Sequence, residues 1–208
     1  MKNILFVVVI LLSFFSKSQA LYSGNIIVEP YFGFPNFGKL FVGSQINSVS
    51  ISYIKGVAPS GGRFEYMIKD NVGIGIDLIY NSVHAKYQQY DTVYMENQLF
   101  VNTSSIDAYM KRLRVQFRLN YHFEVANPQL DVYSGIGFGT NNRTYNAVRN
   151  GNIDYTSDFK NLMGLGSFPI SMRLSAGFRY FFSSHWGIVS EFGLGGPLLS
   201  GGISYKIL

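Results

Sequence analysis

Arginines recur on one side of residues 111–123, and their spacing could support anion binding or salt-bridge formation. The polar side chains at every second position from 112 onward are Arg112, Arg114, Gln116, Arg118, Asn120 and His122. The intervening positions are apolar: Leu113, Val115, Phe117, Leu119, Tyr121 and Phe123. A period of two indicates a β-strand, because successive side chains point to opposite faces of a pleated chain. One face of this strand therefore presents a row of guanidinium groups.

Carboxylates that could pair with these arginines occupy equivalent positions in other alternating segments. The inward acids that we expect are Glu29, Glu65, Asp77, Asp131 and Glu191. The inward bases that we expect are Arg63, Lys69, Arg112, Arg114, Arg118, Arg173, Arg179 and Lys206. Buried charges are costly without partners. All of these residues except the two lysines form the predicted interior charge network.

Strand adjacency predicts particular ion pairs within this network. We expect Arg118 to lie near Asp77 or Glu65. Arg179 should lie near Asp131, and Arg173 near Glu191. A network paired in this way would act as a plug that holds a barrel shut. The alternative is a narrow path for ions or small solutes, lined by the excess of arginine.

Hydrolytic chemistry would need a nucleophile and a histidine near the outer rim. Of the three histidines, His84 lies at the root of a long connection, with Ser82 and Asp107 nearby. A lipid-modifying hydrolase is therefore a second alternative, although the sequence favours no catalytic residue. The glycine-rich runs at 135–139 and 193–196 are not phosphate loops, because no helix follows them. With no cysteine, thiolate metal sites are excluded, and we expect no cofactor or metal.

Eight segments alternate strongly enough to be strands, and they must position these side chains. They span residues 25–34, 63–69, 72–81, 111–123, 130–140, 168–182, 186–195 and 199–208. Three long connections at 35–61, 84–108 and 141–167 read as loops, although residues 49–54 could extend a strand. The other connections are short. This asymmetry predicts an all-β chain that forms an eight-stranded antiparallel up-and-down transmembrane β-barrel.

A soluble barrel with the same alternation turned inside out is the rival architecture. Against it, the polar face is rich in glycine, which a crowded barrel interior needs: Gly73, Gly75, Gly135, Gly137, Gly139, Gly177, Gly187, Gly193 and Gly202. The apolar face is almost free of charge. Aromatic residues gather on that face toward the short-turn end, as in an interfacial girdle: Tyr66, Tyr121, Phe123, Tyr180, Phe182, Trp186 and Tyr205. We therefore expect the apolar face to meet lipid.

The N-terminus has the layout of a secretory signal peptide. Lys2 precedes an apolar run at 4–15, and Ser18-Gln19-Ala20 supplies small residues at a cleavage site. The predicted division is a signal peptide at 1–20 and a barrel at 21–208; a buried helix or a short anchor is the alternative. Cleavage would remove two lysines and no acid, lowering the net charge from +5 to +3. So weak a bias does not favour nucleic acid.

The last strand carries a pattern of polar residue, glycine and two spaced hydrophobic residues: Ser200, Gly202, Tyr205 and Ile207. It resembles the C-terminal insertion signal of outer-membrane barrels, although the usual terminal Phe is absent and Leu208 adds one residue. The amino-acid sequence of residues 62–66 and 191–199 is also similar to that of short proteins with an outer-membrane β-barrel domain. Residues 21–208 thus resemble the small OmpA/OmpX-type barrels of Gram-negative bacteria.

The resemblance implies a location and partners, but no single activity. It implies the outer membrane, reached after Sec-type cleavage near Ala20. Outer-membrane lipid and the barrel-assembly machinery, acting on the C-terminal strand, are the implied partners, and a monomer is expected. The long loops could bind an extracellular ligand through tyrosines suited to adaptable recognition: Tyr87, Tyr90, Tyr94, Tyr145 and Tyr155. The predicted role is structural or surface-interacting.

Overall fold

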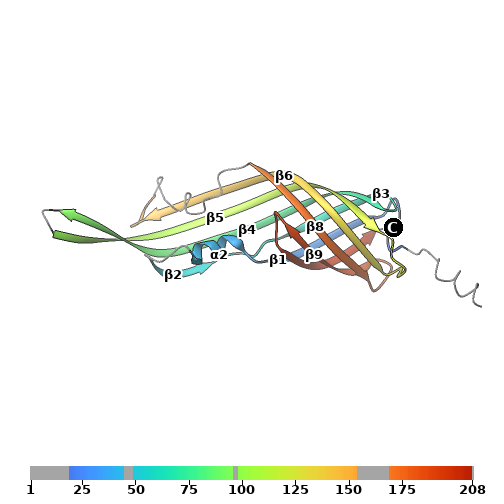
Figure 1. Cartoon of the computed structure of the whole chain (residues 1–208), viewed down its shortest axis with the longest axis horizontal. Helices are drawn as coiled ribbons and strands as arrows, with labels where there is room; N and C mark the ends of the chain where they lie inside the picture. Colours follow the sequence, from blue (N-terminus) through green and yellow to red (C-terminus); the bar gives the residue numbers. More distant parts are fainter. Residues whose placement is uncertain (1–18, 45–48, 96–97, 154–168, 208) are drawn as a thin grey trace, which may run out of the picture.

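Eight antiparallel strands form a closed barrel in the computed structural model, which describes residues 19–44, 49–95, 98–153 and 169–207 (Figure 1). The barrel strands are β1 (Ile26–Phe34), β3 (Ser60–Lys69), β4 (Val72–Met95), β5 (Gln98–Phe123), β6 (Leu130–Arg149), β8 (Ile170–Phe181), β9 (Trp186–Leu194) and β10 (Leu199–Ile207). Each pairs with its neighbours along the chain, and β1 pairs with β10 to close the ring. The predicted eight-stranded architecture is confirmed.

The first long connection contains regular structure, so its prediction as a loop was wrong. Helix α2 (Phe37–Ser44) is followed by β2 (Val49–Lys55), which pairs with the outer part of β4. Asn36 precedes the helix, accepts a hydrogen bond from the Lys39 amide and donates to the Ser82 carbonyl. Its side chain thus caps the helix and ties it to β4. No helix within the described ranges is long and apolar enough to cross a membrane.

The second long connection and the described part of the third, residues 141–153, are also largely strand, contrary to prediction. The β4–β5 ladder continues without a shift from Val72–Tyr121 to Met95–Gln98. Strand β6 runs on to Arg149, where the two-residue strand β7 (Asn152–Ile153) pairs back onto it. Residues 154–167 of the predicted third loop lie outside the described residues. We call residues 82–95, 98–110 and 141–149 the outer extension; the β4–β5 hairpin projects beyond the other strands (Figure 1).

In residues 83–87 and 106–110, where the outer extension begins, the strands keep their alternation but exchange the polarity of the two faces. Closer to the short turns, Leu78 and Val115 point outward and Asp77 points into the barrel. Beyond residue 82, the apolar side chains point inward and form a buried cluster: Val83, Ala85, Tyr87, Ile106, Ala108, Met110 and Ala147. Outward positions there carry His84 and Lys86, and Lys111 follows at the boundary with the lipid-facing wall. A wall in lipid needs an apolar exterior, whereas a wall in water needs an apolar core, so the outer extension stands in water.

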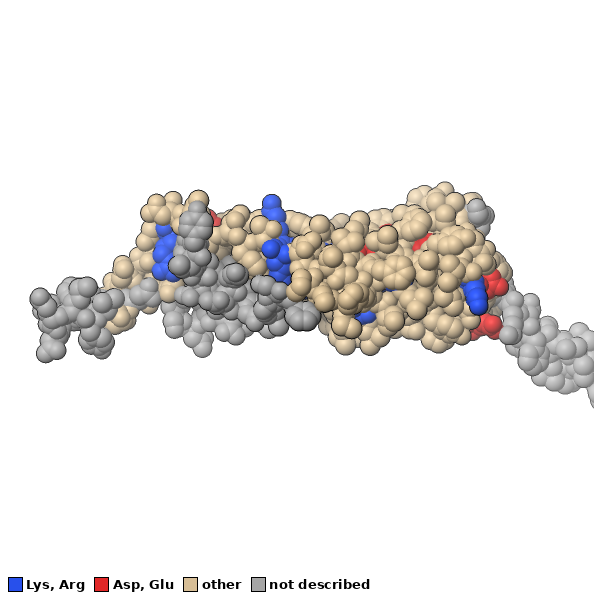
Figure 2. Space-filling view, turned by 90° about the horizontal axis from the view of Figure 1, so that it is seen from above, with Lys and Arg blue, Asp and Glu red and all other residues tan. Residues whose placement is uncertain are grey.

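The wall between the extension and the short turns is apolar on the outside. Figure 2 shows it nearly free of charged side chains, which gather at the short-turn end and over the extension. Among the aromatic residues predicted to form a girdle, six are outward and exposed: Tyr66, Tyr121, Phe123, Tyr180, Phe182 and Trp186. The seventh, Tyr205, packs against Trp186 with ring centroids 4.7 Å apart. This exterior distinguishes a transmembrane barrel from the soluble rival.

Glycines on the inner face leave room for large polar side chains. A Cβ added at Gly177 would lie 2.7 Å from the ring of Tyr133, and one added at Gly193 would lie 2.9 Å from Nη2 of Arg173. Both distances are too short for carbon contacts. The interior therefore excludes side chains at these positions because its arginines and tyrosines occupy the space.

The short-turn end holds a small apolar cluster made of Ala20, Leu21, Ile27, Met67 and Phe181. Nζ of Lys206 donates to the Ala20 carbonyl at 3.0 Å, so the residues around the predicted cleavage site pack against the last strand. Residues 1–18 of the predicted signal peptide lie outside the described residues. Cleavage after Ala20 therefore stays a prediction.

Candidate functional site

Arg179 on β8 is the centre of the first ion cluster inside the barrel. Its guanidinium lies 2.7 Å from Glu29 on β1, 2.5 Å from Glu65 on β3 and 2.7 Å from Asp131 on β6. The Arg179 side chain is 1% exposed. Three carboxylates from three other strands thus share one buried cation, and each pairing is a short, charge-assisted hydrogen bond.

Glu191 on β9 is the centre of a second cluster with the charges reversed. Its carboxylate accepts from Arg173 on β8 at 2.6 Å and from Arg118 on β5 at 2.7 Å. Arg63 on β3 lies 3.0 Å from the same group. Three guanidinium groups thus share one buried carboxylate, which is the mirror image of the cluster around Arg179.

Arg63 links the two clusters, because it lies 3.8 Å from Glu29 as well as 3.4 Å from Asp77. Asp77 also lies 3.3 Å from Arg118. Two tyrosines complete the link. The Tyr31 hydroxyl donates to Asp77 at 2.6 Å beneath Arg63, and the Tyr133 hydroxyl donates to Glu191 at 2.9 Å beneath Arg179. Each ring adds a cation–π contact to the ion pairs.

His122 occupies the remaining gap between two acids. Its Nδ1 lies 2.7 Å from Asp131 and its Nε2 lies 3.0 Å from Glu65. Asn120 donates to the same Glu65 carboxylate at 2.6 Å. The interior thus contains five carboxylates, four arginines and one histidine in mutual contact. When His122 is protonated, these charges balance.

The structure brings together most of the residues predicted for the interior charge network. Arg118 meets Asp77, Arg179 meets Asp131 and Arg173 meets Glu191. Arg112 and Arg114 do not join: Arg112 donates to Asn141 and Arg114 donates to the Gly195 carbonyl. They lie on the inward face nearer the outer end of the barrel than the acids, and neither pairs with a carboxylate of the described residues.

The prediction that Lys69 points into the barrel was wrong. Lys69 is exposed, because a register shift between Met67 and Lys69 turns it out of the interior. In the C-terminal motif, Ser200 is buried and accepts from Arg63 at 2.9 Å, while Ile207 points outward. Gly202 is half-buried.

Three contributors were missing from the predicted network: Tyr31, Tyr133 and His122. Each follows an acid or an arginine along its strand in steps of two, so the alternation already placed all three inside. Tyr31 lies two positions from Glu29, and Tyr133 two positions from Asp131. The predicted network counted only Asp, Glu and Arg, whereas a histidine can bridge two carboxylates and a tyrosine can both donate a hydrogen bond and face a guanidinium.

The arrangement expected for a hydrolase does not form around His84. Its Nε2 lies 2.6 Å from Asp107 and 3.2 Å from the Tyr53 hydroxyl. The Ser82 hydroxyl accepts from the Val57 amide instead. A nucleophilic serine would have to share a hydrogen bond with the histidine. The three residues therefore lack the geometry of a relay.

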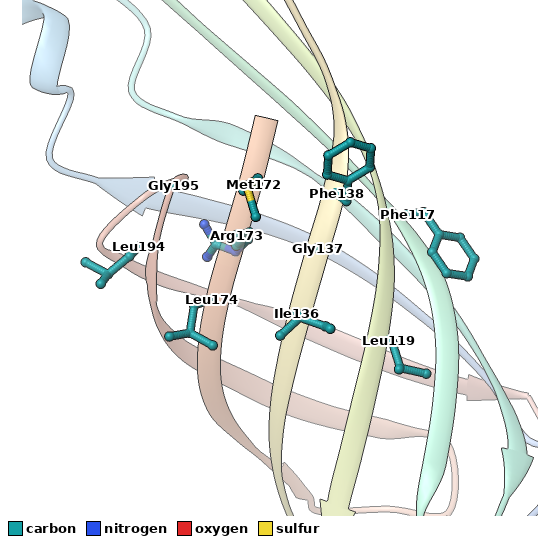
Figure 3. A pocket seen from close by; sticks show the side chains of 10 residues that line it. All are labelled: Phe117, Leu119, Ile136, Gly137, Phe138, Met172, Arg173, Leu174, Leu194 and Gly195. Atoms are coloured by element: carbon teal, nitrogen blue, oxygen red, sulfur yellow. The ribbon is translucent and has the colours of Figure 1, made fainter. Parts of the chain in front are cut away.

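An apolar groove of about 610 Å³ lies on the outer surface of the wall (Figure 3). Phe117 and Leu119 of β5, Ile136 and Phe138 of β6, and Met172 and Leu174 of β8 line it, with Leu194 at the end of β9. Most of these side chains are outward and exposed. Arg173 borders the groove, but its guanidinium is engaged with Glu191 inside the barrel. The groove therefore offers only apolar contact, of the kind that suits a lipid chain.

No family model and no curated protein matches the chain. Among solved structures, it is similar to outer membrane protein OprG from Pseudomonas aeruginosa, with 13% identity, 92% of this chain and 98% of that chain covered, and a TM-score of 0.49. It is also similar to the N-terminal β-barrel domain of Pseudomonas aeruginosa OprF, with 10% identity, 90% and 100% covered, and a TM-score of 0.44.

A third similarity is to Ail, the attachment invasion locus protein of Yersinia pestis. The identity is 12%, with 89% of this chain and 99% of that chain covered, and the TM-score is 0.33. Their descriptions name an outer membrane protein for OprG and a β-barrel domain for OprF. At such low identities and TM-scores, the transmembrane barrel class rests on the strand pairing and the apolar wall of this chain.

Proposed function

We propose that this protein is an integral barrel of the bacterial outer membrane, closed by its interior charge network, with a structural or surface-interacting role and no catalysis. The apolar exterior and the aromatic residues toward the short turns support membrane insertion. The water-exposed outer extension supports an orientation with the long hairpin outside the cell. Secretion through a signal peptide at 1–20 and insertion through the C-terminal strand complete the proposal.

One observation carries the closed interior: ion pairs cross the full width of the barrel. Strand β8 and strand β3 lie on opposite sides of the ring, separated by β9, β10 and β1. Nevertheless, Arg179 of β8 lies 2.5 Å from Glu65 of β3. Breaking one partner away from such a buried pair typically costs about 3–5 kcal/mol. A continuous ion path along the axis would have to displace several of these pairs at once.

Recording in planar lipid bilayers tests the closed interior. We expect the purified barrel to produce no stable single-channel steps. Arg179→Ala, which removes the cross-barrel cation, serves as the comparison, since it should be the variant most prone to conduct. Stable anion-selective steps from the wild-type chain would contradict the closed interior and support the alternative of a narrow ion channel.

Membrane location is tested by fractionation and by electrophoresis without boiling. A closed barrel should migrate as a compact form that shifts to lower mobility when it is boiled, and it should be recovered with the outer membrane. Recovery in the soluble periplasm would contradict the location. A cleaved N-terminus at Leu21, read by mass spectrometry of the recovered protein, would establish the processing site.

Surface interaction would depend on the outer extension, but not on all of the tyrosines expected to bind a ligand. Tyr87 is 6% exposed and belongs to the buried apolar cluster, and Tyr145 packs against that cluster. Assigning these two to an exposed binding surface was wrong. Tyr90 is exposed. The side chain of Tyr94 and the whole of Tyr155 fall outside what the structure describes.

A further inference from the structure

Three arginines meet at the outer end of the barrel interior, where the polarity of the two faces exchanges. Arg112 on β5 is directly opposite Arg143 on β6, and Arg114 follows one step deeper, opposite Asn141. Like charges placed directly opposite each other across a sheet are destabilising. The outer end of the interior therefore concentrates guanidinium groups on two neighbouring strands.

Arg112 and Arg114 have different partners from the four arginines of the two ion clusters, Arg63, Arg118, Arg173 and Arg179. Nε of Arg112 donates to Oδ1 of Asn141 at 2.7 Å, and Nη1 of Arg114 donates to the Gly195 carbonyl at 2.6 Å. Within the described ranges, neither guanidinium has a carboxylate within 4 Å. The four arginines of the network each have at least one.

Burial makes the position of Arg114 more demanding still. The residue is 4% exposed, and its buried Nε has no hydrogen-bond partner. A buried cation with an unused donor is costly unless an anion or water completes its contacts. Arg112 is only half-buried, so an anion arriving from outside would meet Arg112 first and Arg114 next.

We propose that Arg112 and Arg114 form a binding site for an oxyanion group, such as a phosphate or a sulfate. The two residues lie two positions apart on one face of β5, which places them about 7 Å apart along the strand. A tetrahedral oxyanion fits between two guanidinium groups at this spacing, because each presents a planar pair of N–H donors.

The oxyanion could come from either of two sources that share this chemistry. One is free phosphate in the external solution. The other is the phosphate of a lipid headgroup, because the site lies at the level where the outer face changes from apolar Leu113 to exposed Lys111. A headgroup at that level would lie near the outer end of the barrel, where β9 and β10 are joined by only four residues, 195–198.

Titration calorimetry with sodium phosphate tests the site, using the refolded barrel in a zwitterionic detergent at ionic strength fixed with sodium chloride. Wild type should bind phosphate saturably, and Arg112→Gln and Arg114→Gln should each bind at least tenfold more weakly. Lys111→Gln is the matched control: it removes the same charge one residue away, on the opposite face, and should bind like wild type. Equal binding by all four proteins would overturn the proposal.

A second measurement does not depend on the variants. The thermal unfolding midpoint of the wild-type barrel should rise with phosphate relative to chloride at equal ionic strength, because a ligand of the folded state stabilises it. Absence of this rise would also overturn the proposal. Neither measurement depends on whether the barrel conducts, so failure here leaves the proposed function standing.

Nanodiscs distinguish the two sources. Phosphate binding to wild type is compared in discs of phosphatidylcholine and in discs that also contain phosphatidylglycerol. A weaker apparent affinity in the anionic discs, absent in Arg112→Gln, supports the site with a lipid headgroup as its occupant. The same affinity in both discs supports the site with the free anion as its occupant.

Discussion

Glu191 and Arg179 are the two residues on which the interior most depends, because each neutralises three partners of opposite charge. A buried ion pair often contributes little net stability compared with apolar packing, whereas removal of one partner is expensive. The interior charge network is thus better understood as a device for closing and registering the barrel than as a source of stability. Loss of a central residue leaves several charges without compensation at once.

Glu191→Gln is therefore expected to destabilise the barrel by at least about 3–5 kcal/mol, the typical cost of breaking one buried pair. Arg63, Arg118 and Arg173 would keep their positive charges without the carboxylate that they share. Urea titration in lipid vesicles, followed by the fluorescence of Trp186, the single tryptophan, measures the change.

Lys69→Gln is the control, since it removes one charge from an exposed position at the end of β3. We expect that substitution to change the free energy of unfolding by less than about 0.5 kcal/mol, as is usual for surface positions. If both variants unfolded at the same urea concentration, the Glu191 carboxylate would not be needed to compensate the three buried arginines.

Gly177→Ala tests the packing of the interior at the scale of one methyl group. The new Cβ would lie 2.7 Å from the Tyr133 ring and 2.8 Å from the Ser190 carbonyl. Overpacking of this kind typically costs about 1–3 kcal/mol. Gly201→Ala is the matched control, because its Cβ would lie 3.8 Å from the nearest atom. The same urea titration compares the two, and a loss at Gly201 as large as that at Gly177 would contradict the steric explanation.

Ion pairs between neighbouring strands could be expected from the sequence, because alternation sets the face and chain order sets adjacency. Arg179 and Asp131, on the neighbouring strands β8 and β6, are such a pair. Contacts across the barrel, such as Arg179 with Glu65, were beyond this reasoning. They depend on the diameter and stagger of the closed ring and on which rotamer each long side chain adopts, and neither is encoded in a period of two.

At the scale of the elements, the lipid-facing strands were predictable and the outer extension was not. The lipid-facing parts of β5 and β8 alternate between apolar and polar residues, so their positions follow from the pattern. In residues 83–87 and 106–110 the period of two persists, but the apolar residues change sides. The strands were predicted from one continuous apolar face. Where the apolar residues move to the other face, this criterion ends the strand, and so the long hairpin was predicted to be a loop.

Shortening the β4–β5 hairpin should leave the barrel and the buried outer cluster intact. Tyr90 pairs with Thr103 across the ladder, so residues 91–102 can be replaced by Asn-Gly, which favours a two-residue hairpin turn. The shortened chain keeps Tyr87 and Ile106, and its unfolding midpoint and heat-shifted electrophoresis should match wild type. Loss of cell-surface or host binding in this folded variant would locate a binding function at the tip.

The comparison variant for that experiment is Ala108→Asp. Ala108 is fully buried in the outer cluster, and an unpaired carboxylate there should cost several kcal/mol, on the order given for unsatisfied buried charges. Limited proteolysis should cut this extension while sparing the lipid-facing barrel. Equal protease resistance of the two variants would contradict the assignment of this cluster as the core of the extension.

At the scale of the whole molecule, the barrel has one tall wall and one low wall. Strands β4, β5 and β6 continue far beyond the lipid-facing region, whereas β9 and β10 are joined at the same end by residues 195–198 alone (Figure 1). The oxyanion site proposed at Arg112 and Arg114 lies against the tall wall and faces the low one.

The pairing of β1 with β10 has a consequence for the order of assembly. Glu29 on the first strand meets Arg179 at 2.7 Å and Ser204, on the last strand, at 2.5 Å. These partners are separated by 150 and 175 residues in the chain. An open, half-finished sheet in the bilayer would present uncompensated charges and unpaired strand edges to hydrocarbon, which is costly for both. The ion pair between Glu29 and Arg179 therefore forms only when the ring closes, so closure also compensates the charges that neighbouring strands leave unpaired.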